Sequence, residues 1–245
     1  MQSEHNDVLR CDDADGVRVL TFQRPDALNA FNQTLWYATA AALEDAATND
    51  DLRCVVLTGS GRAFSAGQDL TELSNPSVFE GQEPGYRRLM PVVESFPKVL
   101  IAAVNGLGVG IGLTLLLHCD VVLIAESARL KVPFLSLGVT TEASASLLMP
   151  AVMGRQRAME VLLTEPWIDA QQAVADGLAL RSVPDDQLMD QTMQLALQVG
   201  ALPLAPLVAT KQLVRDGTAD AIRMAREREL EAFEHLVADL MRSAT

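Results

Sequence analysis

Basic residues are scarce in this chain. Of its 245 residues, 19 are Lys or Arg and 32 are Asp or Glu, which gives a formal net charge of −13 at pH 7. Nucleic-acid binding depends on clustered Lys and Arg that neutralise phosphates. This balance therefore argues against nucleic acid as a partner. An anionic small ligand would have to be held by local basic groups or by backbone N–H donors.

Cysteine is scarce as well. Cys11, Cys54 and Cys119 are scattered, odd in number and include no CxxC pair. Neither a disulfide framework nor a cysteine-based zinc site is indicated, and we expect no metal. A cytoplasmic protein in a reducing environment is the expectation.

An export signal and long uninterrupted hydrophobic runs are also lacking. The first residues, MQSEHNDVLRCDDADG, are polar and acidic where a signal peptide needs a basic start and an apolar run. The longest apolar stretch is interrupted by Asn105, four glycines, His118 and Asp120. This pattern favours buried α/β segments over a membrane span. With 49% hydrophobic and 21% charged residues, the chain is expected to be globular and to have no membrane partner.

Three well-known motifs fail when they are checked position by position. In NGLGVGIGLTLL, every register of the dinucleotide fingerprint GxGxxG has Ile or Leu in place of the last glycine, and no P-loop GK[ST] string occurs. A hydrolase elbow GxSxG centred on Ser65 would need glycine at Ala63, and the three histidines form no recognisable triad arrangement. Ser65 is therefore interpreted as structural.

What the sequence does contain is an alternation of strand and helix patterns. Residues 32–50 have helical spacing with Asn32 as a plausible N-cap, and Asp169 with Gln172 resembles a capping box in a helix that ends at Gly177. Periodicity predicts strands at 16–25, 53–61, 98–106 and 120–132, and helices at 32–50, 81–96, 110–119 and 144–164, the last interrupted at Pro150 and Gly154. An α/β core is followed by a helical portion.

The chain after residue 185 is predicted to be helical throughout, with breaks at Pro203, Pro206 and Gly217. We place an α/β core at 1–185 and a C-terminal helical region at 186–245. Within that region a set of apolar residues at helical spacing exceeds what a lone tail needs, so it predicts either self-association or packing onto the chain's own core. The set is Ile222, Ala225, Leu230, Phe233, Leu236, Val237 and Leu240.

Two strand ends, LTGSGRAFSAGQDL and IAAVNGLGVGIGLTL, lead through small residues into helices. Glycines there let a ligand approach the main chain, and free N–H groups near a helix N-terminus can bind an oxyanion without a charged side chain. The alternative is a pair of tight turns that merely pack closely. Two such loops in one chain favour the first interpretation.

These segments resemble the crotonase (enoyl-CoA hydratase/isomerase) superfamily. AFSAGQDL resembles its AGxDL loop, and KVLIAAVNGLGVGIGLTLLLHCDVVLIAESARL resembles its second signature. RPDALNA and DAQQAVADGLALRSVP are similar to two further family segments, so the resemblance covers the chain past residue 15. It implies a spiral of ββα turns, a helical C-terminal region, and assembly as a homotrimer or hexamer.

The resemblance also implies the substrate, an acyl-CoA thioester, with no separate cofactor. Its carbonyl oxygen would be held by the N–H groups of Ala66 and Ile111, the latter at a position where the family usually has glycine. Asp69 is interpreted as a loop anchor and Asp120 as an anchor of a helix-to-strand turn, because short acids favour local bonding. The substrate is further expected beside Asn29, Ala30, Ala63, Gly67, Gln68, Asp69, Leu70, Gly110, Thr114 and Phe134.

The acid/base residue distinguishes the possible reactions. The family's well-known hydratases use two glutamates, and the corresponding residues here are Thr114 and Phe134, neither of which transfers protons near neutral pH. Glu142 follows in VTTEASASLLMP, which resembles LVPEAGSSYLLP of the peroxisomal-type 3-enoyl-CoA to 2-enoyl-CoA isomerases and their bacterial relatives. There a single carboxylate moves a proton from C2 to C4.

An apolar wall of Phe134, Leu135 and Leu137 is expected to raise the pKa of Glu142. The alternative for Glu142 is a first-turn carboxylate favoured by a helix dipole. Three functions stay open: an isomerase, a hydratase of fatty acid metabolism or other lyase, and a non-catalytic acyl-CoA-binding homologue. Arg62, Arg87 and Arg88 are candidates for contact with CoA phosphates or are simply solvated.

Overall fold

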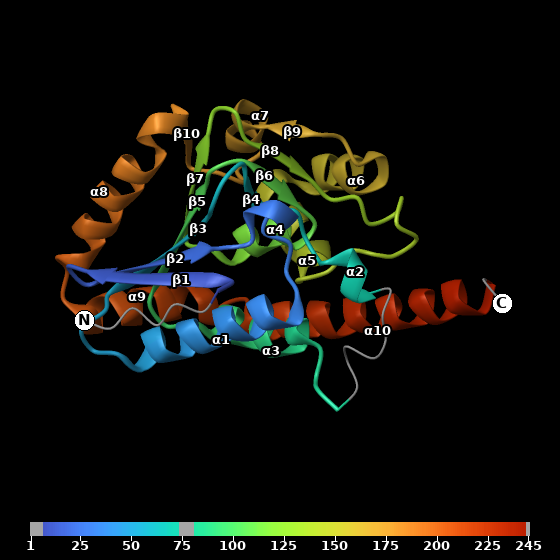
Figure 1. The fold of residues 1–245 in the computed structure, drawn as a ribbon, viewed down its shortest axis with the longest axis horizontal. Helices are drawn as coiled ribbons and strands as arrows, with labels where there is room; N and C mark the ends of the chain where they lie inside the picture. Colours follow the sequence, from blue (N-terminus) through green and yellow to red (C-terminus); the bar gives the residue numbers. More distant parts are fainter. Residues whose placement is uncertain (1–6, 74–80, 244–245) are drawn as a thin grey trace.

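The computed structural model describes residues 7–73 and 81–243 (Figure 1). Its larger sheet has six strands in the order β1-β2-β3-β5-β7-β10, in which β1 and β2 form an antiparallel hairpin and the other neighbours are parallel. These strands are β1 Leu9–Ala14, β2 Val17–Phe22, β3 Cys54–Gly59, β5 Val99–Val104, β7 Val121–Ala125 and β10 Arg181–Val183.

A smaller sheet has the order β4-β6-β8-β9. Its strands are β4 Ala63–Ser65, β6 Leu107–Val109, β8 Arg129–Lys131 and β9 Ile168–Asp169, and only the β8–β9 pair is antiparallel. Strand β3 is followed by β4, β5 by β6 and β7 by β8, so the chain repeatedly gives one strand to each sheet before it enters a helix. This order confirms the predicted ββα arrangement.

Helices connect the strands and cover the sheets. They are η1 Pro25–Ala27, α1 Gln33–Thr48, α2 Leu70–Leu73, α3 Gly85–Ser95, α4 Ile111–Thr114, η3 Leu115–His118, α5 Ala145–Met153, α6 Arg155–Thr164, α7 Ala170–Ala175, η4 Asp185–Gln187, α8 Leu188–Gly200, α9 Leu204–Asp216 and α10 Ala219–Ser243. Figure 1 shows α10, in red, passing α3 and extending beyond the core. The predicted α/β class with a helical C-terminal region is confirmed.

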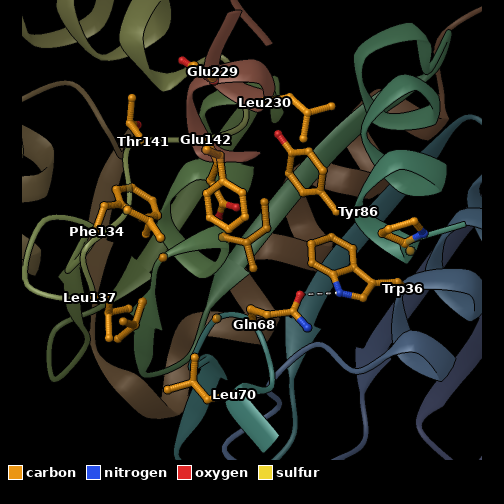
Figure 2. A pocket seen from close by; sticks show the side chains of 18 of the residues that line it. Trp36, Gln68, Leu70, Tyr86, Phe134, Leu137, Thr141, Glu142, Glu229 and Leu230 are labelled. Carbon is orange, nitrogen blue, oxygen red and sulfur yellow. Dashed lines mark hydrogen bonds between the residues drawn. The ribbon is translucent and has the colours of Figure 1, made fainter. Parts of the chain in front are cut away.

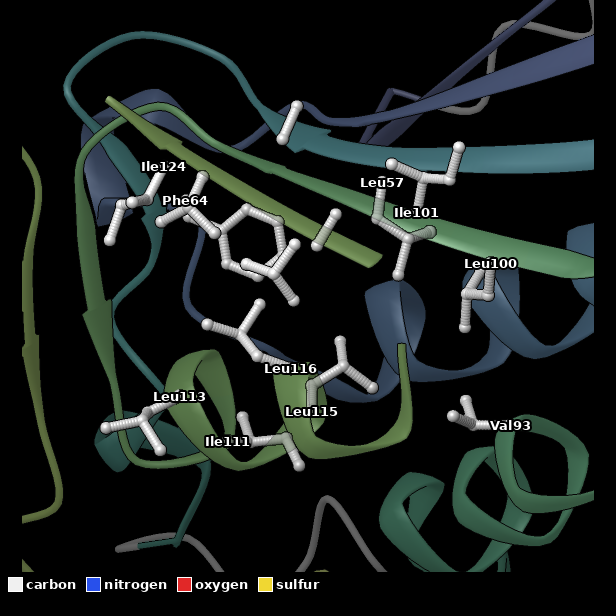
Figure 3. Packing of buried hydrophobic residues seen from close by; sticks show 14 of the residues in the cluster. Leu57, Phe64, Val93, Leu100, Ile101, Ile111, Leu113, Leu115, Leu116 and Ile124 are labelled. Carbon is white, nitrogen blue, oxygen red and sulfur yellow. The ribbon is translucent and has the colours of Figure 1, made fainter. Parts of the chain in front are cut away.

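The core is apolar because its central strands are buried on both faces, as Val-, Ile- and Leu-rich parallel strands usually are. Figure 3 shows Leu57 of β3 and Ile101 of β5 in one cluster with Leu115 of η3. Ile111 and Leu113 of α4 belong to the same cluster, so the short helix is anchored by its own apolar side chains. The N-terminus of α4 is thereby fixed against the sheet.

Several predicted boundaries are confirmed by capping contacts. The Asn32 side chain accepts the Leu35 N–H at 2.9 Å, and the Asp169 side chain accepts the Gln172 N–H at 2.8 Å. Gly177 ends the α7 segment in the left-handed region with φ 77°. Asp69 accepts the Thr71 N–H at 3.1 Å, as expected of a loop anchor.

Other boundaries differ from the prediction. Pro150 lies inside α5, and Pro206 is the third residue of α9, where its missing N–H would have no partner within the helix. Strand β1 was not predicted, because its acidic residues make the segment look polar although alternate side chains are less exposed. Asp120 does more than close a local turn: its carboxylate accepts the Leu100 N–H and the Lys211 ammonium, each at 2.7 Å, and so joins β5 to α9.

The C-terminal helices pack closely onto the core. Helix α8 contacts β3, β5 and β7, and the predicted boundary after residue 185 falls in η4 and stays a prediction. Within the described chain no single helix is long and apolar enough to cross a membrane, and residues 185–216 meet that test only as a pair bent by 107°.

Part of the apolar face of α10 packs onto its own chain. Ala225 is buried, Leu230 and Phe233 line a cavity, and Leu236 is 38% exposed. The side chain of Leu240 lies outside the described part. Packing onto the core therefore accounts for several of these residues, while self-association stays a prediction.

Candidate functional site

A cavity of about 470 Å³ lies where five parts of the chain meet: α1, the loop after β4, the start of α3, the β6–α4 junction and α10 (Figure 2). The segment from Pro133 to Glu142 closes another side. Most of the exposed lining is apolar. Figure 2 shows Phe134 on one side of the cavity and Trp36 and Tyr86 on the other. Such a cavity suits an apolar group with a few polar anchor points.

The two glycine-containing loops approach each other closely beside this cavity. A Cβ at Gly112 would lie 2.3 Å from the Ser65 carbonyl oxygen, and one at Gly67 would lie 2.9 Å from the Val109 carbonyl oxygen. Gly67 also has φ 98°, a backbone conformation that favours glycine. The loops are thus both closely packed turns and walls of the cavity, so the two interpretations given for them from the sequence are compatible.

The N–H of Ala66 is not available to a ligand. It donates to the Leu28 carbonyl at 2.9 Å, which corrects the expectation that Ala66 supplies an oxyanion donor. Sequence spacing could not show this, because the acceptor lies far back in the chain on a residue with φ 52°. Ala66 still lines the cavity.

Two other cavity residues keep free N–H groups. Among the residues that the structure describes, no acceptor takes the N–H of Gln68 or of Ile111. Gln68 is held on both sides, since the Phe31 N–H donates to the Gly67 carbonyl at 2.7 Å and the Asp69 N–H donates to the Phe31 carbonyl at 2.9 Å. Ile111 begins α4, where helix N–H groups lack partners. Together they are candidates for an oxyanion site.

Glu142 lines the same cavity. It lies three residues before α5, so it is not the first-turn carboxylate of the alternative interpretation. Burial, followed by the negative charge of Glu229, raises the pKa of Glu142 to about 7. The direction agrees with the expectation, but Leu135 is 48% exposed and is not among the lining residues, whereas Phe134 and Leu137 are.

The backbone after Glu142 turns through an unusual shape. Ala143 and Ser144 have φ values of 57° and 59°, which are uncommon for residues other than glycine. The Ala143 N–H donates to the Tyr86 hydroxyl at 2.8 Å, and His118 Nε2 lies 2.8 Å from the Ala143 carbonyl oxygen. Burial lowers the pKa of His118 to about 4, so the imidazole is neutral at pH 7 and donates from Nε2.

Two further carboxylates reach the cavity from α10, and both are engaged. The oxygens of Glu229 accept the N–H groups of Ser144 and Ser146, each at 2.7 Å, so each oxygen already holds one backbone hydrogen bond. Glu234 pairs with Arg87. Among the described lining residues, Glu142 is therefore the carboxylate that is left to exchange a proton.

The remaining predicted residues divide into two groups. Gly67, Gln68, Leu70, Gly110 and Phe134 line the cavity. The structure does not bring the other five to it: Asn29, Ala30, Ala63, Asp69 and Thr114.

Several of those five residues have contacts away from the cavity. Asn29 donates to the carbonyls of Ser60 at 2.8 Å and Ala63 at 2.7 Å, and Asp69 pairs with Arg24 at 2.9 Å. Thr114 is buried. Their role as substrate contacts stays a prediction.

Several cavity residues were not predicted from the sequence. Trp36 and Tyr86 come from helices α1 and α3, and their rings pack edge to face at 5.8 Å. Leu230 and Phe233 were recognised only as an apolar helix face. No local motif points to Tyr86 or Glu229.

Two of the three candidate phosphate-binding arginines form ion pairs within the chain. Arg87 pairs with Glu234 and Arg88 pairs with Glu44. Across residues 7–73 and 81–243, no three His, Cys, Asp or Glu side chains gather as a metal site needs.

Comparison with known proteins identifies the family. The model of the family described as "Enoyl-CoA hydratase/isomerase" matches residues 12–243. The chain is 35% identical over 213 residues to the 1,2-epoxyphenylacetyl-CoA isomerase of Escherichia coli strain K12, covering 84% of this chain and 81% of that protein. It is 34% identical over 222 residues to the 2,3-dehydroadipyl-CoA hydratase of the same organism, covering 91% and 87%.

A solved structure agrees. The enoyl-CoA hydratase/isomerase from Pseudoalteromonas atlantica T6c superimposes with a TM-score of 0.92 at 35% identity, covering 94% of this chain and 92% of that one. The resemblance to crotonases is thus confirmed over nearly the whole length. The chain belongs to the enoyl-CoA hydratase/isomerase family.

Proposed function

We propose that this acyl-CoA-processing enzyme moves the double bond of a 3-enoyl-CoA thioester to the 2-position. The observation that carries the proposal is Glu142, the one carboxylate among the described lining residues without a hydrogen-bond or ion-pair partner, in a cavity also lined by Gln68 and Ile111, whose N–H groups have no acceptor in the described chain. An allylic shift needs one acid/base group and one oxyanion site. The site offers that set.

In the proposed mechanism the thioester oxygen accepts the N–H groups of Gln68 and Ile111. Glu142 removes a proton from C2, and the negative charge spreads onto the oxygen of the dienolate, where the two N–H groups stabilise it. Glu142 then returns the proton at C4, which leaves the double bond in conjugation with the carbonyl. A pKa of about 7 suits this role, because a group that both takes and gives a proton works best near the ambient pH.

The lining of the cavity supports an apolar acyl group as the substrate. Trp36, Tyr86, Phe134, Leu230 and Phe233 surround the space near the polar groups. We further propose that the CoA thioester is the substrate without an additional cofactor, and that the protein acts in the cytoplasm as a homotrimer or hexamer.

Hydration of a 2-enoyl-CoA is the second candidate, because one relative is named a hydratase. Two observations weigh against it. Thr114 and Phe134 stand where the two proton-transfer groups would be needed, and both oxygens of Glu229 are occupied by backbone N–H groups. Water activation would thus fall to Glu142 alone.

A substrate assay separates these functions. The protein is incubated with trans-3-hexenoyl-CoA and, separately, with trans-2-hexenoyl-CoA, and the products are identified by mass spectrometry and by the ultraviolet absorbance of the conjugated thioester. The proposal predicts conversion of the 3-enoyl substrate to the 2-enoyl product. Fast formation of the 3-hydroxy product from the 2-enoyl substrate would support hydration, and tight binding without any turnover would support a non-catalytic homologue.

A further inference from the structure

The turn that carries Glu142 is held in a shape that its own residues do not favour. Two consecutive non-glycine residues lie in the left-handed region, and such conformations persist only where the surroundings impose them. Ser144 stands where the similar isomerase segment has glycine. The contacts around the turn therefore decide where the Glu142 carboxylate lies.

Helix α10 supplies most of those contacts. The Glu229 carboxylate binds the N–H groups of Ser144 and Ser146, and the Ser144 hydroxyl donates to the Ile222 carbonyl at 2.8 Å. Glu229 is 6% exposed and Ser144 is fully buried. Charge-assisted bonds of this kind, shielded from water, are among the stronger ones in proteins.

Helix α10 is in turn fixed to α3, which holds the opposite side of the turn. Arg226 forms two hydrogen bonds to Glu94 of α3, at 2.9 and 3.1 Å. Tyr86, also of α3, accepts the Ala143 N–H. The turn after Glu142 is thus clamped between two helices that are bound to each other.

The charges that face Glu142 come from several elements. Glu229 of α10 is a carboxylate that raises the pKa of Glu142. His118 of η3 is neutral, Tyr86 of α3 bears a phenol whose pKa is raised by burial and then by Glu142, and Arg226 is paired with Glu94. Burial raises the pKa of Glu229 itself, and the nearby Arg228 favours its ionised form, so the charge that acts on Glu142 is the negative one of Glu229.

We propose that Glu229 is a positioning residue for catalysis: it fixes the left-handed turn that aims Glu142 at the substrate and places a negative charge beside it. This inference rests on the proposed function, in which Glu142 is the acid/base. Glu229 itself exchanges no proton with the substrate. Through Glu229, the C-terminal helix α10 sets the position of the acid/base Glu142.

Glu229→Gln tests the proposal, because the amide retains the size of the side chain, removes the charge and sets an NH₂ group against one of the two backbone N–H groups. The expected result is a fall of about 10–10² in kcat for trans-3-hexenoyl-CoA, because small displacements of a catalytic group cost rates of this order. Affinity for saturated hexanoyl-CoA should stay within about twofold. Glu231→Gln, on the exposed side of the same helix, is the matched control and should change neither value.

The protonation of Glu142 provides a measurement that does not depend on turnover. Infrared titration, with the spectrum of Glu142→Gln subtracted in each background, isolates the protonated carboxyl band of Glu142. Without the neighbouring charge the carboxyl should ionise at lower pH, and the acid limb of the kcat/KM profile should move in the same direction. A merely structural role would lower the rate equally at every pH and leave the titration where it was.

A folded Glu229→Gln protein with an unchanged kcat, or with an unchanged Glu142 titration, would overturn the proposal. If the wild type isomerises no 3-enoyl-CoA but the titration moves as expected, Glu229 keeps its electrostatic role and the proposed function fails instead. Should Glu229→Gln not fold, Ser144→Gly combined with Glu229→Gln relieves the left-handed cost. The double variant should fold and isomerise the substrate at a reduced rate, and its Glu142 should ionise at a lower pH than in the wild type. A Glu142 titration like that of the wild type in this double variant would contradict the proposal.

Discussion

Replacing Glu142 by glutamine should make the protein more stable above neutral pH, even though it removes the proposed catalytic group. A carboxyl whose pKa rises from 4.5 to about 7 on folding disfavours the ionised form in the folded protein. The difference corresponds to about 3 kcal/mol. This is an upper limit, because Glu142 is only half-buried and lines the cavity, where water screens charges.

The sign follows from proton binding. Between pH 4.5 and about 7 the folded protein keeps the Glu142 proton while the unfolded chain has lost it, so the folded state binds more protons. The free energy of unfolding contributed by this group then falls as the pH rises, and the loss is complete above the folded pKa. The amide of the Glu142→Gln variant does not ionise, so the variant escapes this loss.

Urea denaturation of wild type and Glu142→Gln across this pH range measures the effect. Their difference in free energy of unfolding should be small near pH 4.5 and should grow to about 2–3 kcal/mol in favour of the variant above pH 7. Glu231→Gln is the control and should show no such trend. A difference that does not vary with pH, or a less stable variant at high pH, would refute the reasoning.

Two further predictions follow from the site and from α10. Ile111→Pro removes one proposed oxyanion donor at the first position of α4, where proline fits the helix, so kcat should fall about 10²–10³-fold. Ile111→Val keeps the N–H, so its kcat should fall far less. Equal losses of kcat in the two variants would point to packing instead. Light scattering at micromolar concentration should give the mass of a trimer or hexamer, since exposed Leu213 and Val214 of α9 and Leu236 of α10 leave apolar surface uncovered, and a monomer mass of 26.4 kDa would contradict assembly.

Features set by neighbouring residues were predictable from the sequence. The cap at Asn32, the αL glycine at Gly177 and the two small-residue loops depend on local backbone preferences, and the structure shows them where they were expected. Glu142 was found because a short segment resembles a known one. Strand β1 was missed because Asp12 and Asp13 made it look like a polar tail, although alternate side chains of this strand are less exposed.

Features that depend on distant pairs were not predictable. The N–H of Ala66 donates to the Leu28 carbonyl, whereas the N–H of Gln68 has no acceptor among the described residues. Leu28 lies far earlier in the chain, so sequence alone could not distinguish the two. The Ser144–Glu229 hydrogen bond spans 85 residues, and Tyr86 reaches Ala143 across 57. Spacing along the chain carries no information about such contacts, because they exist only once the sheets and helices have packed.

The most direct test of the account compares wild type with Glu142→Gln in isomerisation of trans-3-hexenoyl-CoA and in binding of saturated hexanoyl-CoA. The amide keeps the shape of the side chain but cannot accept the C2 proton. The account predicts a fall of about 10²–10⁴-fold in kcat with nearly unchanged affinity for hexanoyl-CoA. A Glu142→Gln protein that isomerises the 3-enoyl substrate as fast as wild type would contradict it.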